Sequence, residues 1–259
     1  MNKTGSAAKV KLNSFDDLFG TEHLQAGTEQ VQEIALSELH EFKGHPFKVL
    51  DDEKMQETVE SIKEHGVLMP GIARPMKDGG YEIIAGHRRR HACEIVGLDT
   101  IPMFIRDYTD DEATIIMVDS NIQREDILPS EKAKAYFMKY EAVKHQGKKG
   151  KGNSLDEVGE TAGESAKTVQ RYIYLAHLSD ALLDMVDKKK IGIVQGVELS
   201  FLTEQQQEWV QVVLEETGVI ISTVQASKLK EYGKSDELTL PMVCLLYTSD
   251  AADEEDSVD

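Results

Sequence analysis

The spacing of apolar residues predicts a mixture of strands and helices in the first half of the chain. Met55, Val59 and Ile62 recur at helical spacing, which predicts an amphipathic helix over residues 51–65. Runs rich in residues that favour β-structure predict strands at 71–75, 81–85 and 100–106. Further helices are expected at 87–96, 110–121 and 131–145, the last of them capped by Ser130.

Beyond residue 146 the apolar spacing is helical throughout. Gly147-Lys-Lys-Gly-Lys-Gly-Asn-Ser154 has the composition of a linker. Helices are predicted after it at 155–162, 165–178, 181–187, 194–202, 204–217 and 223–232. The expected organisation is therefore a disordered arm at 1–31, an α+β domain at 32–146, the linker at 147–154 and an all-α domain at 155–235.

The end of the chain does not continue this helical pattern. Residues 243–259 resemble a translated sequencing-adapter read-through, which would make the segment non-native. The alternative is an acidic, disordered tail, because the last ten residues carry six acids and no base. Both interpretations leave the segment out of the expected core.

Charge and cysteine content narrow the class of protein. The formal net charge of −18 argues against a nucleic-acid partner, but basic residues cluster at 88–90, 144–151 and 188–190, and a local patch matters more than the net charge. Cys93 and Cys244 match no metal-ligand spacing, which suggests a reducing compartment. No apolar run resembles a signal peptide or the roughly 20 residues of a membrane span, so we expect a cytoplasmic protein with no membrane contact.

The strand, glycine and helix at 81–97 contain an electrostatic conflict. Arg88, Arg89 and Arg90 lie in the first helical turn, where the backbone N–H groups and the helix dipole are already positive. An anion behind Gly86 removes the conflict, because glycine lets a phosphate approach the helix N-terminus and arginines bind its oxygens in pairs. The alternative is a solvated basic face, or ion pairs between these arginines and nearby acids.

A second polar group follows the helix predicted at 110–121. Within Asp119-Ser-Asn-Ile-Gln-Arg-Glu-Asp126, Asp119 and Asn121 offer oxygen ligands to a hard cation, and Arg124 offers a phosphate contact. An ordinary polar loop is the alternative. His87 and His91 have metal-ligand spacing, but no third ligand is evident, so surface or packing histidines are favoured over a zinc site.

Residues 155–176 have the spacing of a helix-turn-helix, with Gly163 at the turn. The positions expected to be buried are Leu155, Val158, Ala162, Val169, Tyr172, Ile173 and Ala176. The candidates for DNA contact cap the second helix or face away from this core: Ser165, Lys167, Thr168, Gln170 and Arg171. The alternative is an ordinary helical hairpin with a solvated outer face.

Three ordered boxes resemble the ParB family of chromosome and plasmid partition proteins, over about residues 34–202. They are Gly66-Val-Leu-Met-Pro70, Gly86-His-Arg-Arg-Arg-His-Ala92 and Ser120-Asn-Ile-Gln-Arg124. The resemblance implies an α+β N-terminal ParB/sulfiredoxin-like domain followed by an all-α helix-turn-helix domain. It also implies a site-specific DNA-binding partition protein that acts as a CTP-responsive clamp, closest to the ParB-like proteins of Firmicute plasmids and integrative elements.

The resemblance further implies ligands and partners. CTP would be bound by Gly86, His87, Arg88, Arg89 and Arg124, with magnesium at Asn121. The implied partners are double-stranded DNA with a centromere-like palindromic site, a second copy of the chain in a homodimer, and a ParA-type ATPase. The arm from Lys9 to Phe19 resembles the segment that stimulates that ATPase.

Two departures from the family pattern bear on catalysis. His45-Pro-Phe47 stands where the family has Gln-Pro-Arg, and Ser120 replaces the acid before the metal-binding asparagine. The resemblance therefore carries CTP binding to this chain but leaves open whether it is a weak CTPase. Two other functions stay open: a transcription regulator of this fold without a nucleotide response, and a nuclease in which His87 or His91 is catalytic.

Overall fold

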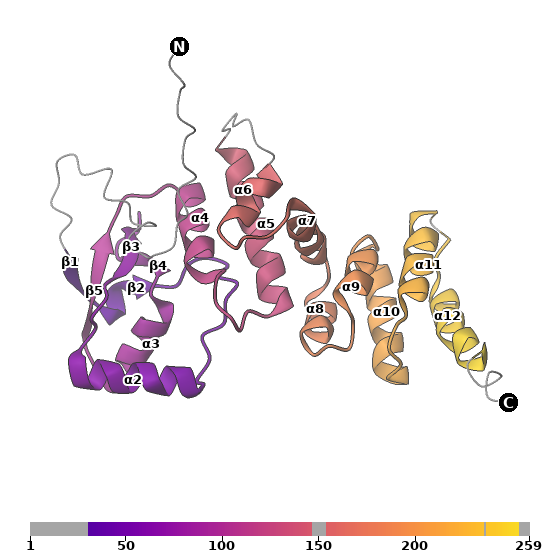
Figure 1. Ribbon diagram of the computed structural model, residues 1–259, viewed down its shortest axis with the longest axis horizontal. Coiled ribbons are helices and arrows are strands. Elements are labelled where there is room, and N and C mark those ends of the chain that lie inside the picture. The colour runs from indigo at the N-terminus through magenta and orange to yellow at the C-terminus, as the bar shows by residue number, and fades with distance from the viewer. Residues whose placement is uncertain (1–30, 147–153, 236, 254–259) are drawn as a thin grey trace, which may run out of the picture.

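A computed structural model describes residues 31–146, 154–235 and 237–253 of the chain (Figure 1). The predicted arm and linker lie outside these residues, apart from Val31 and Ser154 at their ends. No helix in the described ranges is long and apolar enough to cross a membrane.

Five strands form one mixed sheet in the order β1-β5-β3-β4-β2. They are β1 (Val31–Ala35), β2 (Leu39–His40), β3 (Gly71–Pro75), β4 (Tyr81–Ala85) and β5 (Thr100–Ile105). β3 pairs antiparallel with β4 and parallel with β5. The sequence pattern missed β1 because it is an edge strand with exposed side chains at its first three positions, and β2 because it has only two residues.

Helices pack on both faces of this sheet, and the alternation of side chains in β4 shows how. Ile83 packs with Ala92 of α3 (His87–Val96) and with the apolar side of α2 (Glu53–His65). The next residue, Ile84, packs on the opposite face in a cluster with α4 (Asp110–Asn121) and α5 (Pro129–His145). Met55, Val59 and Ile62 are buried in α2, which confirms the predicted amphipathic helix.

The rest of the described chain is helical and extends away from the sheet (Figure 1). Its helices are α6 (Ser154–Glu160), α7 (Ala166–Leu175), α8 (Asp180–Asp187), α9 (Ile193–Leu199), α10 (Glu204–Thr217), α11 (Thr223–Lys234) and α12 (Leu240–Asp253). The helix predicted at 165–178 ends three residues early, because Ser179 caps a new helix by accepting a hydrogen bond from the Leu182 amide.

The predicted cap at Ser130 is wrong. The N-cap of α5 is Leu128, and Pro129 occupies the first turn, where its fixed φ is favourable. Ser130 instead donates its amide and hydroxyl to Asp187 of α8, at 2.9 and 2.5 Å. Glu131 accepts from the Leu128 amide and supplies the missing cap.

The expectation that residues 243–259 lie outside the helical pattern is wrong for the described part of that segment. Helix α12 runs from Leu240 to Asp253. Val243 is fully buried in the core of the C-terminal helices, and Leu246 packs against the same core. The Leu246 carbonyl also accepts from the Gln225 side chain of α11 at 3.0 Å. The non-native origin of the segment stays a prediction.

Helix α5 packs on both halves of the molecule. One continuous cluster contains Ile84 of the sheet, Tyr136 of α5, Val158 of α6 and Val169 of α7. Buried Lys139 of α5 adds polar contacts to this packing, since its ammonium group touches residues of both α4 and the segment around α6. The division into domains at the linker stays a prediction, and α5 joins the two sides.

Candidate functional site

The N-terminus of α3 follows a glycine in a conformation that other residues rarely adopt. Gly86 is the N-cap with φ 115°, and no side chain caps this end of the helix. A Cβ atom at Gly86 would lie 3.2 Å from the Cα of Gly71. Glycine therefore brings β3 and the start of α3 close together, and the first backbone N–H groups of α3 have no side-chain acceptor.

The three arginines of α3 have different partners. Arg88 pairs with Asp52, the N-cap of α2, at 3.0 Å, and Arg90 pairs with Glu94 at 3.0 Å. Both contacts are the ion pairs that the sequence left open as the alternative to an anion site. The Arg88 hydrogen bond, together with the Met55 amide, lowers the pKa of Asp52.

Arg89 has no carboxylate partner among the described residues. Its guanidinium donates to the Met69 and Pro70 carbonyls, the latter at 2.8 Å. Burial lowers the pKa of Arg89, because a charged group is costly away from water. Two of the three sequence boxes therefore meet here, since Arg89 of the second box holds the end of the Gly66–Pro70 box.

A buried histidine pair lies at the same end of α3. The rings of His45 and His87 are 3.9 Å apart between centroids. Both Nε2 atoms are buried without a hydrogen-bond partner in the described part of the chain. Burial, and then the charges of His45 and Arg90, lower the pKa of His87 to about 3, so this ring is neutral at pH 7. The sequence identified His45 only as a departure from a family pattern and missed the pair.

His91 lies apart from this pair. Its Nε2 is 2.7 Å from Asp51 and its Nδ1 is 3.5 Å from Glu94. The i, i+4 spacing of His87 and His91 therefore does not bring the two rings to one ligand. No group of three or more His, Cys, Asp or Glu side chains in the described ranges is arranged to hold a metal ion.

The third box lies at the end of α4. Asn121 donates its side-chain amide to the Met117 carbonyl at 2.9 Å and to the Ser120 hydroxyl at 3.1 Å. Asp119 is occupied by a buried ion pair with Lys139 at 2.6 Å. Arg124 is near the histidine pair, because its charge adds to burial in lowering the pKa of His45. The charge of Arg124 therefore acts on the histidine pair, whereas Asp119 is occupied by Lys139.

The predicted DNA-contact residues lie on and before α7. Ser165 caps α7 by accepting from the Thr168 amide at 3.2 Å, and its hydroxyl lies 3.0 Å from the Thr168 hydroxyl. Lys167, Gln170 and Arg171 are exposed. Thr168 is half-buried. The five residues thus lie on one short stretch, with three long polar side chains in solvent.

The inner side of α7 matches the sequence prediction. Val169 is fully buried and Ile173 nearly so, while Tyr172 packs on the core partly exposed. Gly163 has φ 68°, so it makes the turn between α6 and α7 in a backbone conformation that favours glycine. The sequence missed Leu175, which is fully buried at the end of α7.

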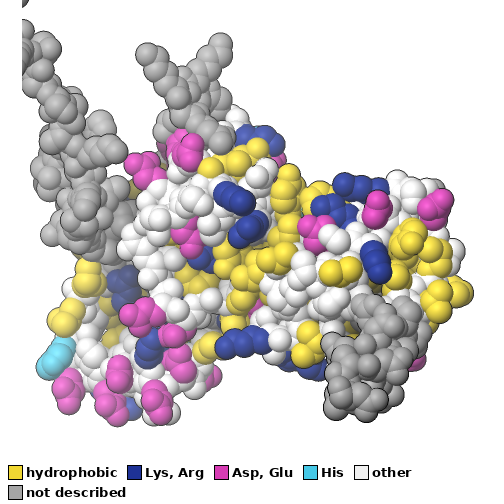
Figure 2. Space-filling model, turned by 45° about the vertical axis from the view of Figure 1, so that its right-hand side comes forward, with side chains coloured by type: hydrophobic (Ala, Val, Ile, Leu, Met, Phe, Trp, Pro, Cys, Tyr) yellow, Lys and Arg dark blue, Asp and Glu magenta, His cyan; other side chains and the backbone are white. Residues whose placement is uncertain are grey.

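Charge is unevenly distributed on the molecule. Figure 2 shows Lys and Arg side chains over the helical part of the visible face and Asp and Glu side chains gathered at its lower left. Helix α2 alone exposes Glu53, Glu57, Glu60 and Glu64. The net charge of −18 therefore does not describe the surface around α7.

Comparison with known proteins identifies the family of this chain. The model of the ParB N-terminal domain matches residues 20–122. A probable chromosome 1-partitioning protein ParB of Deinococcus radiodurans is 32% identical over 211 residues, which cover 81% of this chain and 70% of that protein. The chain belongs to the ParB family.

Other members of the ParB family match over a similar range. A probable chromosome-partitioning protein ParB of Pseudomonas putida is 33% identical over 182 residues, which cover 69% of this chain and 59% of that protein. A nucleoid occlusion protein of Halalkalibacterium halodurans is 28% identical over 70% of this chain and 61% of that protein. This ParB chain thus spans less than two thirds of the length of these two relatives.

Solved ParB structures resemble the chain at lower similarity. A C-terminally truncated chromosome-partitioning protein ParB of Caulobacter crescentus, complexed to the centromeric parS site, matches with 21% identity and a TM-score of 0.43. The match covers 77% of this chain and 98% of that one. The same protein complexed with CTP-γ-S matches with 23% identity and a TM-score of 0.34, with the same coverage.

The start of α3 in this ParB chain suits a nucleotide phosphate. The left-handed Gly86 and the uncapped helix end leave backbone N–H groups as donors for an anion, and the Nε2 atoms of His45 and His87 are buried without a partner nearby in the described part of the chain. The fit to magnesium is narrower. Asn121 offers one amide oxygen and Asp119 is already paired, so a metal there would depend on phosphate and water oxygens, which Mg²⁺ commonly retains.

Proposed function

We propose that this chain is a site-specific DNA-binding protein of chromosome or plasmid partition whose DNA binding responds to CTP. Family membership and the partitioning relatives at 32 and 33% identity support the role in partition. The observation that carries the nucleotide response is the uncapped N-terminus of α3 behind Gly86, with Arg88 beside it and His45 and His87 buried nearby.

The α3 end would hold the CTP phosphates through backbone N–H groups and through the side chains of Arg88 and Arg124. Arg88 would exchange Asp52 for a phosphate, because an exposed carboxylate and a phosphate compete for the same guanidinium. Arg89 would hold the Gly66–Pro70 segment against this end, and Arg124 would contact the phosphates from the other side. Gly86 and His87 complete the set of proposed contacts.

Magnesium bound near Asn121 would neutralise phosphate charge. CTP hydrolysis is outside the proposal, because His45 and Ser120 stand where the family pattern has Gln and an acid. His45 instead stacks on His87, which makes it a packing partner of the proposed phosphate site.

Helices α6 and α7 would act as a helix-turn-helix. Lys167, Gln170 and Arg171 are exposed on α7, and the early part of such a helix reaches base edges in the major groove. Ser165 and Thr168 would contact phosphates or bases at its start. A homodimer would bind a palindromic DNA site. Nucleotide binding would close the dimer around the DNA. A ParA-type ATPase would be the cytoplasmic protein partner.

Titration calorimetry with CTP, ATP, GTP and UTP tests the nucleotide part, with magnesium and with or without DNA selected from a randomised pool. We expect binding of CTP alone, strengthened by the selected DNA. Arg88→Ala should abolish it, whereas Arg90→Ala, which removes the same charge from the same helix, should leave it largely intact. Equal CTP affinities of the two variants would refute the assignment.

A transcription regulator of the same fold that binds DNA without nucleotide is the second candidate. The ion pairs of Arg88 and Arg90 favour it, because they give both arginines a structural role without any ligand. Absence of CTP binding by the wild type, with the selected DNA present, would decide for this candidate.

A further inference from the structure

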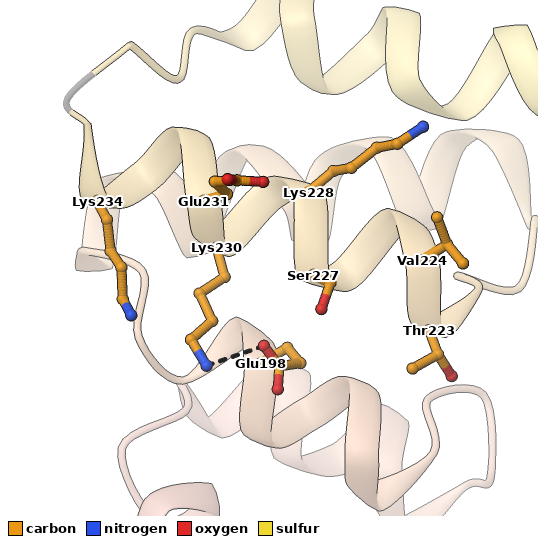
Figure 3. A pocket seen from close by; sticks show the side chains of 8 residues that line it. All are labelled: Glu198, Thr223, Val224, Ser227, Lys228, Lys230, Glu231 and Lys234. Atoms are coloured by element: carbon orange, nitrogen blue, oxygen red, sulfur yellow. Dashed lines mark ion pairs between the residues drawn. The ribbon is translucent and has the colours of Figure 1, made fainter.

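A stripe of polar side chains runs along one face of α11, opposite α9 (Figure 3). Thr223, Ser227, Lys230 and Lys234 are spaced i, i+4, i+7 and i+11, so they share one helix face. Together with Glu198 of α9 they line an open groove. These four side chains of α11 are called the α11 stripe.

Aromatic rings connect the α11 stripe to the outer face of α7. The side-chain amide of Gln170 donates to the Tyr174 hydroxyl at 3.3 Å, and the Tyr174 ring lies 5.1 Å from the Phe201 ring. Lys230 and Lys234 place their ammonium groups 4.1 and 5.5 Å from the centre of Phe201. Phe201 is 40% exposed, so it is a surface residue that links the two sides. These contacts form one surface from Gln170 to Lys234.

The chemistry of the α11 stripe suits a phosphate backbone. Lys230 is paired with Glu198 at 2.9 Å, which neutralises the acid on the α9 side of the groove. Exposed Glu231 is a second acid in the groove, so its lining carries three lysines against two carboxylates. Lys234 is exposed and has no carboxylate partner among the described residues. The exposed hydroxyls of Thr223 and Ser227 add donors, and Lys, Ser and Thr side chains are common phosphate contacts in protein–DNA complexes.

We propose that the α11 stripe binds the DNA phosphate backbone beside the segment read by α7. The inference rests on the proposed DNA binding of α7, to which the stripe is joined through Tyr174 and Phe201. Contacts to phosphate fix the position of a protein on a duplex without reading its sequence. In an acidic chain, such a local basic surface opposes the repulsion between protein and DNA.

Lys234 and Lys63 provide a matched test. Both are exposed lysines, but Lys234 belongs to the stripe, whereas Lys63 lies on α2 and does not line the groove. Binding to a duplex selected from a randomised pool, and to a random-sequence duplex, is measured by fluorescence anisotropy over a range of salt concentrations. We expect Lys234→Gln to reduce the slope of log K against log salt by about 0.9, the value for one lost phosphate contact. Lys63→Gln should keep the wild-type slope.

Glu198→Gln tests the stripe in the opposite direction. It removes a negative charge from the groove and frees Lys230, so DNA should bind more tightly and with a steeper salt dependence. A misfolded variant cannot produce tighter binding, which separates this result from a loss of structure.

Equal salt slopes for Lys234→Gln and Lys63→Gln, with wild-type binding intact, would overturn the inference and leave the proposed function in place. A wild type that binds no duplex from the pool would overturn the proposed function and the stripe with it. If Lys234→Gln lowered binding only to a polyglutamate probe, with the DNA slope unchanged, the stripe would belong to an acidic protein partner instead.

Discussion

The two proposed ligand surfaces differ in whether their charges already have partners. At the start of α3, Arg88 is paired with a carboxylate and Arg89 with two backbone carbonyls. On α7, Lys167 and Arg171 are exposed and have no ion-pair partner in the described ranges. The α7 face can take a ligand without rearrangement, whereas the α3 end must exchange internal contacts first. The affinity for a nucleotide would therefore depend on the difference in free energy between its phosphate contacts and the internal contacts that they replace. Nucleotide binding would shift the protein from one arrangement to the other, which is the physical basis of the proposed response to CTP.

Lys139 links α4 to the segment around α6, between the elements that carry the two surfaces, and its loss should have the largest effect on stability. It is 3% exposed and contacts Asp119 of α4, the Val158 carbonyl of α6 and the Thr161 hydroxyl. Lys139→Met leaves the Asp119 carboxylate buried without a partner, so we expect the free energy of unfolding to fall by about 3–5 kcal/mol in urea denaturation.

Lys144→Ala is the matched control for Lys139→Met, because Lys144 lies on the same helix in an exposed pair with Glu141. Its effect should be about 0–1 kcal/mol. Similar losses for both variants would mean that the contacts of Lys139 with α4 and α6 do not stabilise the fold.

The sequence predicted the features that local interactions determine and missed those that depend on contacts between distant residues. The bounds of α3 were predicted to the residue because local signals set them, with Gly86 and Gly97 at its two ends. Ser130 was misassigned because its partner, Asp187, lies 57 residues away. The Arg88–Asp52 pair spans 36 residues, and no spacing in the sequence distinguishes that acid from the many others.

The predictions for residues 243–259 and for the histidine pair failed for the same reason, because the deciding contacts join residues distant in the sequence. Val243 is buried by packing against α10 and α11, which a local reading of the last residues does not reveal. His45 and His87 are brought together only by the fold. In the sequence, His45 was a departure from a family motif, and His87 was considered only with His91 and as a CTP contact.

Gly86→Ala changes the backbone shape at the start of α3 and leaves its charged side chains in place, so it tests whether CTP binding depends on that shape. Its φ of 115° strains any residue with a Cβ, which costs on the order of 1–3 kcal/mol, and the added atom would lie 3.2 Å from Gly71. Gly86→Ala should therefore lose CTP binding, as measured by calorimetry.

Gly97→Ala controls for backbone strain at the other end of the same helix. Gly97 also has positive φ, but no atom lies within 4 Å of its added Cβ. It should lose stability and keep its affinity for CTP. Retained CTP binding in Gly86→Ala would remove Gly86 from the phosphate site.

Arg171→Ala tests the open surface of α7. If Arg171 contacts a base edge, the affinity for a selected DNA site should fall by about 1–3 kcal/mol, with relaxed preference at one base position. Lys63→Ala, on the acidic helix α2, serves as the charge-matched control. An unchanged preference at every base position would exclude Arg171 from sequence readout.

The buried histidine of the α3 end should make stability depend on pH. The unfolded chain takes up a proton on His87 near the ordinary pKa of 6.5, but the folded chain does so only near 3, so stability falls as the pH drops below 6.5. Between pH 7 and 5.5 this loss is about 1 kcal/mol. His87→Asn should reduce the dependence in thermal unfolding, with buried His45 still contributing, and the exposed His65→Asn should not change it. A wild-type stability that is flat over this range would contradict the buried, neutral ring.

The smallest expected effect tests the exchange of partners that distinguishes the two regions. Asp52→Asn removes the carboxylate that holds Arg88, so Arg88 is free before the nucleotide arrives and CTP should bind more tightly by about 0–1 kcal/mol, the usual range for an exposed pair. Asp51→Asn, which loses a contact with His91 instead, should leave the affinity unchanged. Because Asp52 also caps α2, the CTP affinities are compared at a temperature where both variants are folded. Weaker CTP binding in Asp52→Asn would mean that Asp52 positions Arg88 for the phosphate and does not compete with it.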